Sequence, residues 1–162
     1  MRRSLLGCAA VLAGLLASEA PAQERGAPDW RTYSNPEFGT QVQFPAGLFS
    51  VSEGRPKQGS GQWLRTADGR AQFSVYSMRN DQGHTPASYL RNNLQVSRQS
   101  LYYQRVAPNF FAISANHGSS IYYSRCNFVR SIIHCVYVIY PRQEKQAWDG
   151  TVTRISRTLR PL

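Results

Sequence analysis

Residues 110–140 read FFAISANHGSSIYYSRCNFVRSIIHCVYVIY. Apolar and aromatic runs alternate with short polar breaks, which predicts three consecutive antiparallel strands over 110–115, 120–129 and 132–140. Gly118 suits the first turn because it tolerates a positive φ, and Pro141 ends the third strand because it has no N–H to donate. We expect the rest of the chain to lie beside or over this meander.

The two cysteines of this stretch, Cys126 and Cys135, are the only ones outside the N-terminal segment. A two-residue loop at Arg130-Ser131 places them directly opposite each other in a non-hydrogen-bonded pair, with Cα atoms about 4.5 Å apart. That separation is within the range that a disulfide tolerates. Arg-Ser is not the Asn-Gly type that two-residue hairpins prefer, and a four-residue loop would change the type of pair. Two unrelated buried thiols are the alternative to the predicted disulfide.

The same register divides the meander into two faces. One face is nearly all apolar, and we expect it to meet the main core: Phe111, Ile113, Tyr122, Cys126, Phe128, Ile133, Cys135, Tyr137 and Ile139. The other face is apolar at one end and polar at the other: Phe110, Ile121, Tyr123, Arg125, Asn127, His134, Val136 and Val138. Because both faces are partly apolar, the sheet needs cover on both sides.

The first 22 residues have the three parts of a secretory signal peptide. A charged start at Arg2-Arg3 precedes an apolar run over 5–16, and small residues follow at 20–22. Gln23 is the expected first residue of a mature protein that is periplasmic or secreted after cleavage near Ala22. We expect no transmembrane anchor, because the apolar run is too short to span a bilayer. The residues before Cys8 match the lipidation motif of bacterial lipoproteins only weakly.

Residues 23–29 are predicted to be a flexible leader, and 30–162 a single α+β domain, because the mature chain is about 140 residues long. Removal of the first 22 residues lowers the formal charge from +10 to +9. The basic residues are scattered, so the surface is either simply basic or attracts an anionic glycan, a lipid head group or an envelope protein. We expect no nucleic-acid partner, since no nucleic-acid motif is present. The sequence leaves the oligomeric state open.

Outside the meander, alternation and turn residues predict strands over 30–34, 40–44, 62–66, 70–78 and 101–106. Residues 52–61 are rich in Gly, Ser and charge and read as a mobile loop. A first helix, capped by Thr85, is expected to run to about Arg98. A final helix is expected to start near Gly150 and to bury the stripe Trp148, Val152, Ile155 and Leu159. These elements predict an antiparallel sheet of about six strands with helices packed on it.

Three motifs carry a resemblance: W-x-x-Y-x-N-P-x-F-G-x-x-V-x-F-P over 30–45, A-D-G over 67–69, and the closing Y-P…R-I-S-R-T-L-R-P. With them the chain resembles small secreted alphaproteobacterial proteins of unknown function. The order of elements is also similar to the PsbP-like α/β/α sandwich. That resemblance implies an antiparallel sheet of six or seven strands with helices on both faces, and an accessory or docking role.

Catalytic signals are weak. The three histidines, His84, His117 and His134, have no metal-ligand spacing, and no Cys-x-x-Cys occurs, so we expect no metal and no cofactor. His134 is predicted to lie opposite Asn127, with Arg125 further along the same face, which makes a candidate anion site. A half-exposed strand edge with ordinary hydrogen bonds is the alternative. The sequence therefore favours a non-catalytic accessory or binding domain, and a hydrolase using His134 or His84 is the second hypothesis.

Overall fold

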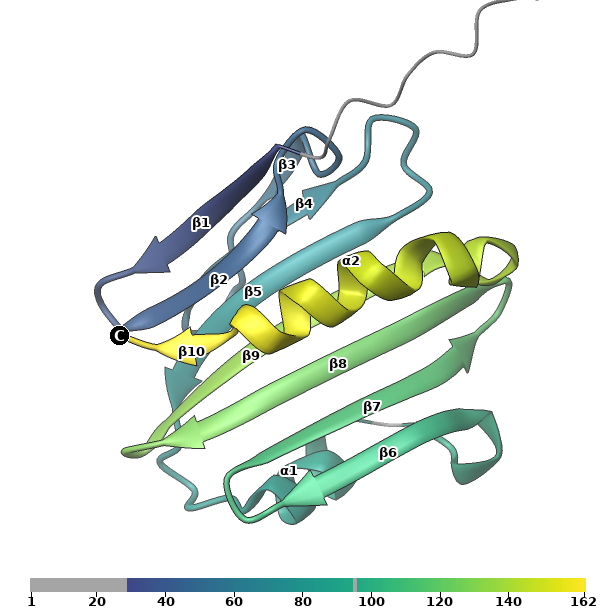
Figure 1. The fold of residues 1–162 in the computed structure, drawn as a ribbon. Coiled ribbons are helices and arrows are strands. Elements are labelled where there is room, and N and C mark those ends of the chain that lie inside the picture. Colours follow the sequence, from purple (N-terminus) through teal and green to yellow (C-terminus); the bar gives the residue numbers. More distant parts are fainter. Residues whose placement is uncertain (1–28, 95) are drawn as a thin grey trace, which may run out of the picture.

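The computed structural model describes residues 29–94 and 96–162. Within these residues two α-helices, two short 3-10 helices and ten strands follow one another. Figure 1 shows their arrangement. Their bounds are β1 Trp30–Asn35, β2 Thr40–Pro45, β3 Val51–Gly54, β4 Ser60–Arg65, β5 Gln72–Arg79, α1 Pro86–Asn93, η1 Arg98–Ser100, β6 Leu101–Ala107, β7 Phe110–His117, β8 Ser120–Val129, β9 Ile132–Pro141, η2 Arg142–Glu144, α2 Lys145–Thr158 and β10 Arg160–Pro161.

The strands form two antiparallel sheets. The large sheet has seven strands in the order β3-β4-β5-β9-β8-β7-β6, and the small sheet has three in the order β1-β2-β10. The main sheet is therefore larger than the predicted sheet of about six strands, and residues 51–54 add to it an unpredicted strand, β3, that pairs with β4. The first hairpin lies outside this sheet and pairs with β10 after α2. The expected mobile loop at 52–61 was also wrong in part. Its two ends belong to β3 and β4, which pair with each other.

The hairpin β8–β9 confirms the predicted register. Arg130 and Ser131 have φ values of 49° and 63°, and positive φ at both positions is what a two-residue type I′ turn requires. Cys126 pairs with Cys135 and is joined to it by a disulfide, with 4.1 Å between the Cα atoms. Such a close approach fits a non-hydrogen-bonded pair. The predicted disulfide is thus present in the structure.

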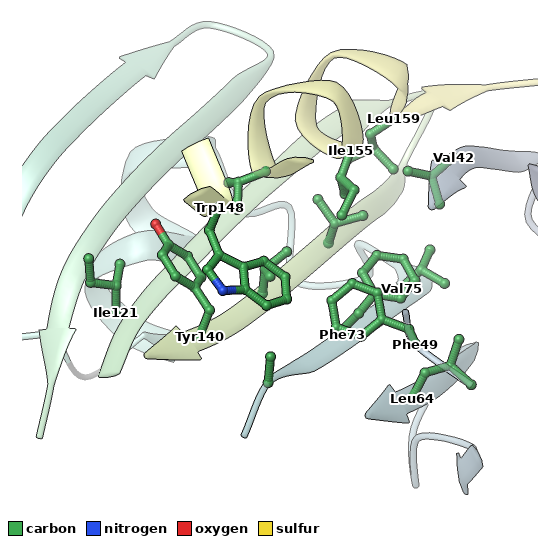
Figure 2. Packing of buried hydrophobic residues seen from close by; sticks show 14 residues of the cluster. Val42, Phe49, Leu64, Phe73, Val75, Ile121, Tyr140, Trp148, Ile155 and Leu159 are labelled. Atoms are coloured by element: carbon green, nitrogen blue, oxygen red, sulfur yellow. The ribbon is translucent and has the colours of Figure 1, made fainter. Parts of the chain in front are cut away.

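The molecule has three layers. On one side of the large sheet lie α2 and the small sheet, and on the other side lies α1 (Figure 1). The larger buried cluster is on the α2 side, where Phe73, Val75 and Tyr140 meet Trp148 and Ile155 (Figure 2). A smaller cluster around Tyr89, Phe111 and the disulfide lies on the α1 side.

The predicted location of the main core was therefore wrong. The expected face, which carries Phe111 and Ile133, holds only the smaller cluster. The opposite face gained more cover because β2 and α2 both present apolar side chains to it, including Val42 and Val152. Stacking of Phe44 on Phe73, with 5.3 Å between the ring centroids, fixes the small sheet over the large one.

Both helices differ from their predicted lengths. Thr85 caps α1 as expected, but the helix ends at Asn93 rather than near Arg98. Asn93 donates its side-chain amide to the Tyr89 carbonyl, and asparagine stabilises a helix interior poorly. By contrast, α2 starts at Lys145, well before Gly150. Gly150 lies on the exposed side of that helix, where a missing Cβ costs only about 1 kcal/mol.

Candidate functional site

The three residues of the predicted polar site, Arg125, Asn127 and His134, lie on the α2 side of β8 and β9. Asn127 and His134 are register partners, as expected, and both are buried. Arg125 is half-buried and donates from Nε to Asn127 Oδ1 over 3.0 Å. The structure therefore brings the three together, and only the arginine is partly accessible. Anion binding by this trio stays a prediction.

His134 joins the two sheets. Its exposed fraction is 1 %, and its Nδ1 lies 2.6 Å from the Thr40 hydroxyl, which itself contacts Ser77 Oγ at 2.5 Å. Thr40 begins β2 of the small sheet, while Ser77 and His134 are paired positions on β5 and β9. Burial lowers the pKa of His134, because the charged imidazolium would lose its water. This hydrogen-bonded group holds the small sheet on the large one.

Asn127 connects the same region to α2. Its Nδ2 donates over 3.0 Å to the carbonyl of Leu159, the C-cap residue of α2. A carbonyl at the C-terminus of a helix has no partner within the helix, so this contact satisfies an otherwise unpaired acceptor. The contacts of Asn127 and His134 are thus internal ones between layers.

The other two histidines lie apart from this group. His84 precedes α1, with its Nδ1 3.4 Å from Ser88 Oγ and its ring edge-on to Tyr89. Ser88 already takes part in the capping box with Thr85. His117 is exposed at the end of β7. Within residues 29–94 and 96–162, no group of three His, Cys, Asp or Glu side chains is placed to hold a metal ion.

The charges of the chain are segregated, a feature that a search for runs of like charge does not reveal. Between Gln82 and Gln143 the sequence has no aspartate and no glutamate. The same segment has six arginines: Arg91, Arg98, Arg105, Arg125, Arg130 and Arg142. It folds into α1 and the strands β6 to β9, of which β6, β7 and β8 form one end of the large sheet.

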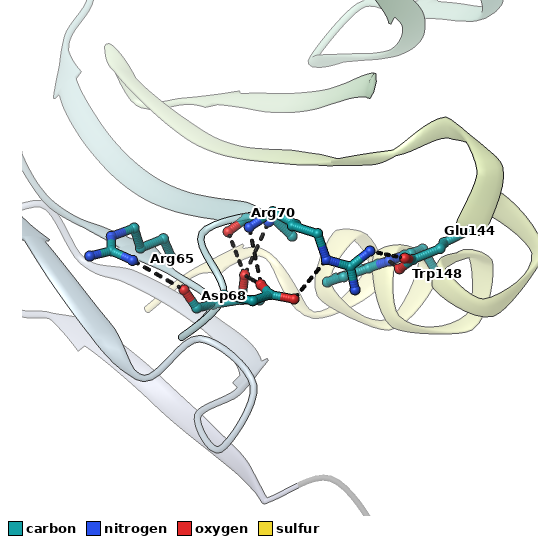
Figure 3. Close-up of polar contacts among 7 residues, drawn as sticks. Arg65, Asp68, Arg70, Glu144 and Trp148 are labelled. Atoms are coloured by element: carbon teal, nitrogen blue, oxygen red, sulfur yellow. Dashed lines mark hydrogen bonds and ion pairs between the residues drawn. The ribbon is translucent and has the colours of Figure 1, made fainter. Parts of the chain in front are cut away.

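In the rest of the described chain, carboxylates form ion pairs with some of the basic side chains. Arg70 is bonded to both Asp68 and Glu144, and Glu144 also accepts from the Trp148 indole (Figure 3). Arg65 pairs with Glu53. Hydrogen bonds from Thr66 and from Arg70 lower the pKa of Asp68, so this carboxylate stays ionised. Ion pairs here link the β4–β5 turn to the start of α2.

The α2 side of β6, β7 and β8 forms what we call the open face, defined by Tyr102, Tyr103, Arg105, Phe110, Ser114 and Arg125. Among the described elements, none lies over β6 and β7 on this side, since α1 is behind them (Figure 1). The exposed fractions of Tyr102 and Tyr103 are 52 % and 47 %. An exposed pair of aromatic side chains beside arginines is typical of a binding surface.

Two guanidinium groups of the open face approach one ring. Cζ of Arg105 lies 5.3 Å from the centroid of Phe110, and Cζ of Arg125 lies 4.5 Å from it. The two arginines are on β6 and β8, and both pair with Ala112 of the strand between them. Neither forms an ion pair with any residue that the structure describes. Together they offer hydrogen-bond donors for an anion.

On the opposite side of the large sheet there is a cavity of about 240 Å³. Its aromatic walls include Trp63, Tyr76, Tyr122 and Tyr137. Tyr76 shares its hydroxyl with Tyr137 at 2.6 Å and with Tyr89 at 2.9 Å. Burial raises the pKa of both Tyr76 and Tyr137, so these phenols stay neutral. This cavity therefore presents mainly uncharged aromatic walls.

The class of protein is an α+β sandwich in which one antiparallel sheet is covered on both sides. Among solved structures, the chain is similar to the solution structure of cyanobacterial PsbP (CyanoP) from Synechocystis sp. PCC 6803, with a TM-score of 0.60 and 11 % identity. The match covers 92 % of this chain and 100 % of that one. It confirms the predicted PsbP-like fold and, at this identity, shows the fold alone.

The sequence itself matches no protein-family model and no curated protein. The resemblance to secreted alphaproteobacterial proteins therefore stays a prediction. No helix among the described residues is long and apolar enough to cross a membrane. The predicted signal peptide and most of the leader lie outside those residues.

Sequence reasoning missed most of the open face. Arg125 and Phe110 were assigned to the correct side of the meander, but Tyr102, Tyr103 and Arg105 were not connected to them. The signal that could have found this face is the lack of acidic residues from Gln82 to Gln143, combined with the run of exposed residues in β6. Counting acids rather than bases reveals the asymmetry.

Proposed function

We propose that this chain is a non-catalytic, exported accessory domain that binds an anionic partner through its basic end. The observation that carries the proposal is the segment from Gln82 to Gln143, which has six arginines and no acid. A surface of one charge sign attracts opposite charge over several ångströms and raises the rate of association. The PsbP-like fold is compatible with an accessory role.

Export is supported by two separate features. The first 22 residues have the pattern of a signal peptide. The buried bridge between Cys126 and Cys135 is typical of proteins that fold in an oxidising compartment. A periplasmic or secreted protein meets acidic glycans, anionic lipid head groups and other envelope proteins.

The hydrolase hypothesis has less support. A general base must reach a nucleophile and a substrate. The side chain of His134 is buried and its Nδ1 is occupied by Thr40, while Ser88 next to His84 serves to cap α1. An activity screen with activated esters and phosphate esters tests this alternative. Turnover that is lost in a His84→Ala or His134→Ala variant would favour it.

Salt dependence tests the binding proposal. Charges are screened beyond about 30 Å at 0.01 M salt but beyond about 8 Å at 0.15 M. Binding of the purified protein to anionic vesicles and acidic polysaccharides should therefore weaken strongly between these two concentrations. Neutral vesicles and neutral dextran are the controls. Binding that saturates at the same affinity in both salts, or equal binding to the neutral controls, would contradict the proposal.

A further inference from the structure

We propose that the open face is the binding site and that its ligand is an acidic polysaccharide. This inference rests on the proposed function and makes it specific to one surface and one chemical class. Three properties of the open face support it: paired guanidinium groups, exposed tyrosines and the length of the strip between its cations.

The guanidinium groups provide the anion site. Neighbouring strands are about 4.8 Å apart, so the backbones of Arg105 and Arg125 are separated by about 10 Å across Ala112. Both side chains nevertheless approach Phe110. Arg125 uses its Nε for Asn127, which leaves its terminal amino groups free for a ligand. A carboxylate or sulfate between the two arginines would accept hydrogen bonds from both.

The tyrosines provide the surface for sugar rings. Tyr103 and Ser114 are paired positions on adjacent strands, next to the row that contains both arginines. Tyr102 lies on the same side and donates its hydroxyl to Asn116, whereas Tyr123 on β8 packs against α2 and donates to Ser156. A tyrosine ring combines an apolar face with a hydroxyl group. A pyranose ring likewise has an apolar C–H face and a rim of hydroxyls, so it can stack on tyrosine and hydrogen-bond at its edge. Small residues on the central strand, Ala112 and Ser114, leave the flanking rings prominent.

The length of the strip favours a polymer over a single ion. From Phe110 to Asn116, β7 extends about 20 Å at the usual rise per residue. At the far end, Arg142 donates to Asn116 Oδ1 over 3.4 Å. Cations therefore stand at both ends, with tyrosines between them. A chain with repeated negative charges and sugar rings between them matches this order.

Two other classes of anion fit less well. A lipid surface binds by burying apolar side chains, whereas the open face offers tyrosines and arginines on a regular sheet. Single-stranded nucleic acid also stacks on aromatic residues beside cations. The disulfide argues against it, because an oxidising compartment holds little nucleic acid.

The test measures the affinity of the purified protein, at low salt, for polygalacturonate, dextran sulfate, neutral dextran, equal mixtures of phosphatidylglycerol and phosphatidylcholine as vesicles, and oligothymidylate. Two variants remove the key groups, Arg105→Gln and Tyr103→Ser. Two matched controls remove an exposed arginine and an exposed aromatic residue from the α1 side, Arg91→Gln and Trp63→Ser. Melting temperatures confirm that all four variants fold.

We expect the acidic polysaccharides to bind most tightly. Arg105→Gln should weaken that binding about tenfold, since it removes charge-assisted hydrogen bonds, and each control should change it by less than about twofold. Equal losses in Arg105→Gln and Arg91→Gln would show diffuse attraction and overturn the site. Tightest binding to vesicles or to oligothymidylate would overturn the ligand class while the proposed function stands. Failure to bind any anionic probe would overturn both.

Discussion

On the α2 side of the large sheet, β5 and β9 lie under the small sheet and α2, whereas β6 carries exposed side chains and β7 carries mainly half-buried ones. Charge differs in the same way. Near the covered strands Arg70 and Arg65 are held by carboxylates, while Arg105 and Arg125 of the open face contact a phenylalanine. Arg70 and Arg65 are thus neutralised internally, whereas Arg105 and Arg125 are not. We propose that the second pair binds the anionic partner.

The largest predicted effect is a difference in stability between a substitution at the covered end and one on the open face. Ile155 is fully buried between α2 and the large sheet, so Ile155→Ala should lower the free energy of unfolding by about 2–5 kcal/mol through lost contacts and a cavity. Tyr103→Ala on the open face should stay within about 0.5 kcal/mol of the wild type. Urea unfolding measures both. A similar loss in the two variants would mean that the open face is part of the core.

The disulfide joins a strand of the uncovered end to a strand of the covered end. It closes a loop of about ten residues, for which the chain-entropy estimate is about 2.5–3 kcal/mol. The variant with Cys126→Ala and Cys135→Ala should therefore fold but unfold at lower urea. Thiol titration of the unfolded, unreduced wild type is the control. Two free thiols per chain there would disprove the bridge.

The strand register within the meander could be predicted from the sequence. Side chains alternate between the two faces of a strand, and one tight turn fixes which residues of β8 and β9 are opposite each other, including Cys126 and Cys135. The side that received the main core could not be predicted in this way. It depends on contacts between Gln41 and Arg160, which are 119 residues apart in sequence, and no local pattern indicates that pairing. Long-range pairing also brings Thr40 to His134.

In the candidate site, too, local pairing was predictable and long-range cover was not. Arg125, Asn127 and His134 were placed together from local pairing alone, and the structure has them on one face. The burial of Asn127 and His134 could not be foreseen, because the cover comes from β2 and α2. The start of α2 was missed for a different reason: favourable packing of Trp148 outweighs the weak helix propensity of Gly150.

A smaller effect should come from pH at the covered end. The folded-state pKa of His134 lies below the usual value near 6.5, so the unfolded chain binds this proton more readily than the folded one. The contribution of His134 to the free energy of unfolding should therefore be fully present above about pH 6.5. It should decrease as the pH falls, by at most about 1.4 kcal/mol per pH unit. The slope is measured from urea midpoints between about pH 7.5 and about pH 5.5, a range that spans the usual histidine pKa.

The variant His134→Gln provides the comparison for this slope. It removes the titrating imidazole, so its stability should be lower at neutral pH but should change less on acidification. If the wild type and the variant showed the same slope, the loss would come from other groups, and His134 would not link the two sheets in a pH-dependent way.

The smallest predicted effect is a gain in stability. Gly150 is exposed within α2, and a Cβ built there meets nothing within 4 Å. Gly150→Ala should raise the free energy of unfolding by about 1 kcal/mol, because alanine loses less backbone entropy in a helix. As a control, Gly61→Ala would put its Cβ 2.1 Å from the Val75 carbonyl oxygen and should destabilise the protein. A gain in both variants would contradict the close approach of β4 and β5.

The uneven distribution of charge gives the molecule an electric dipole with its positive pole toward β6, β7 and β8, because the carboxylates lie outside the segment from Gln82 to Gln143. A dipole turns in an external field before any contact forms. Near an anionic layer at low ionic strength, the protein would rotate so that Arg105 and Arg125 arrive first, which would raise the fraction of productive encounters. The acid-free segment would then determine the direction of approach, independently of the contacts that hold the partner afterwards.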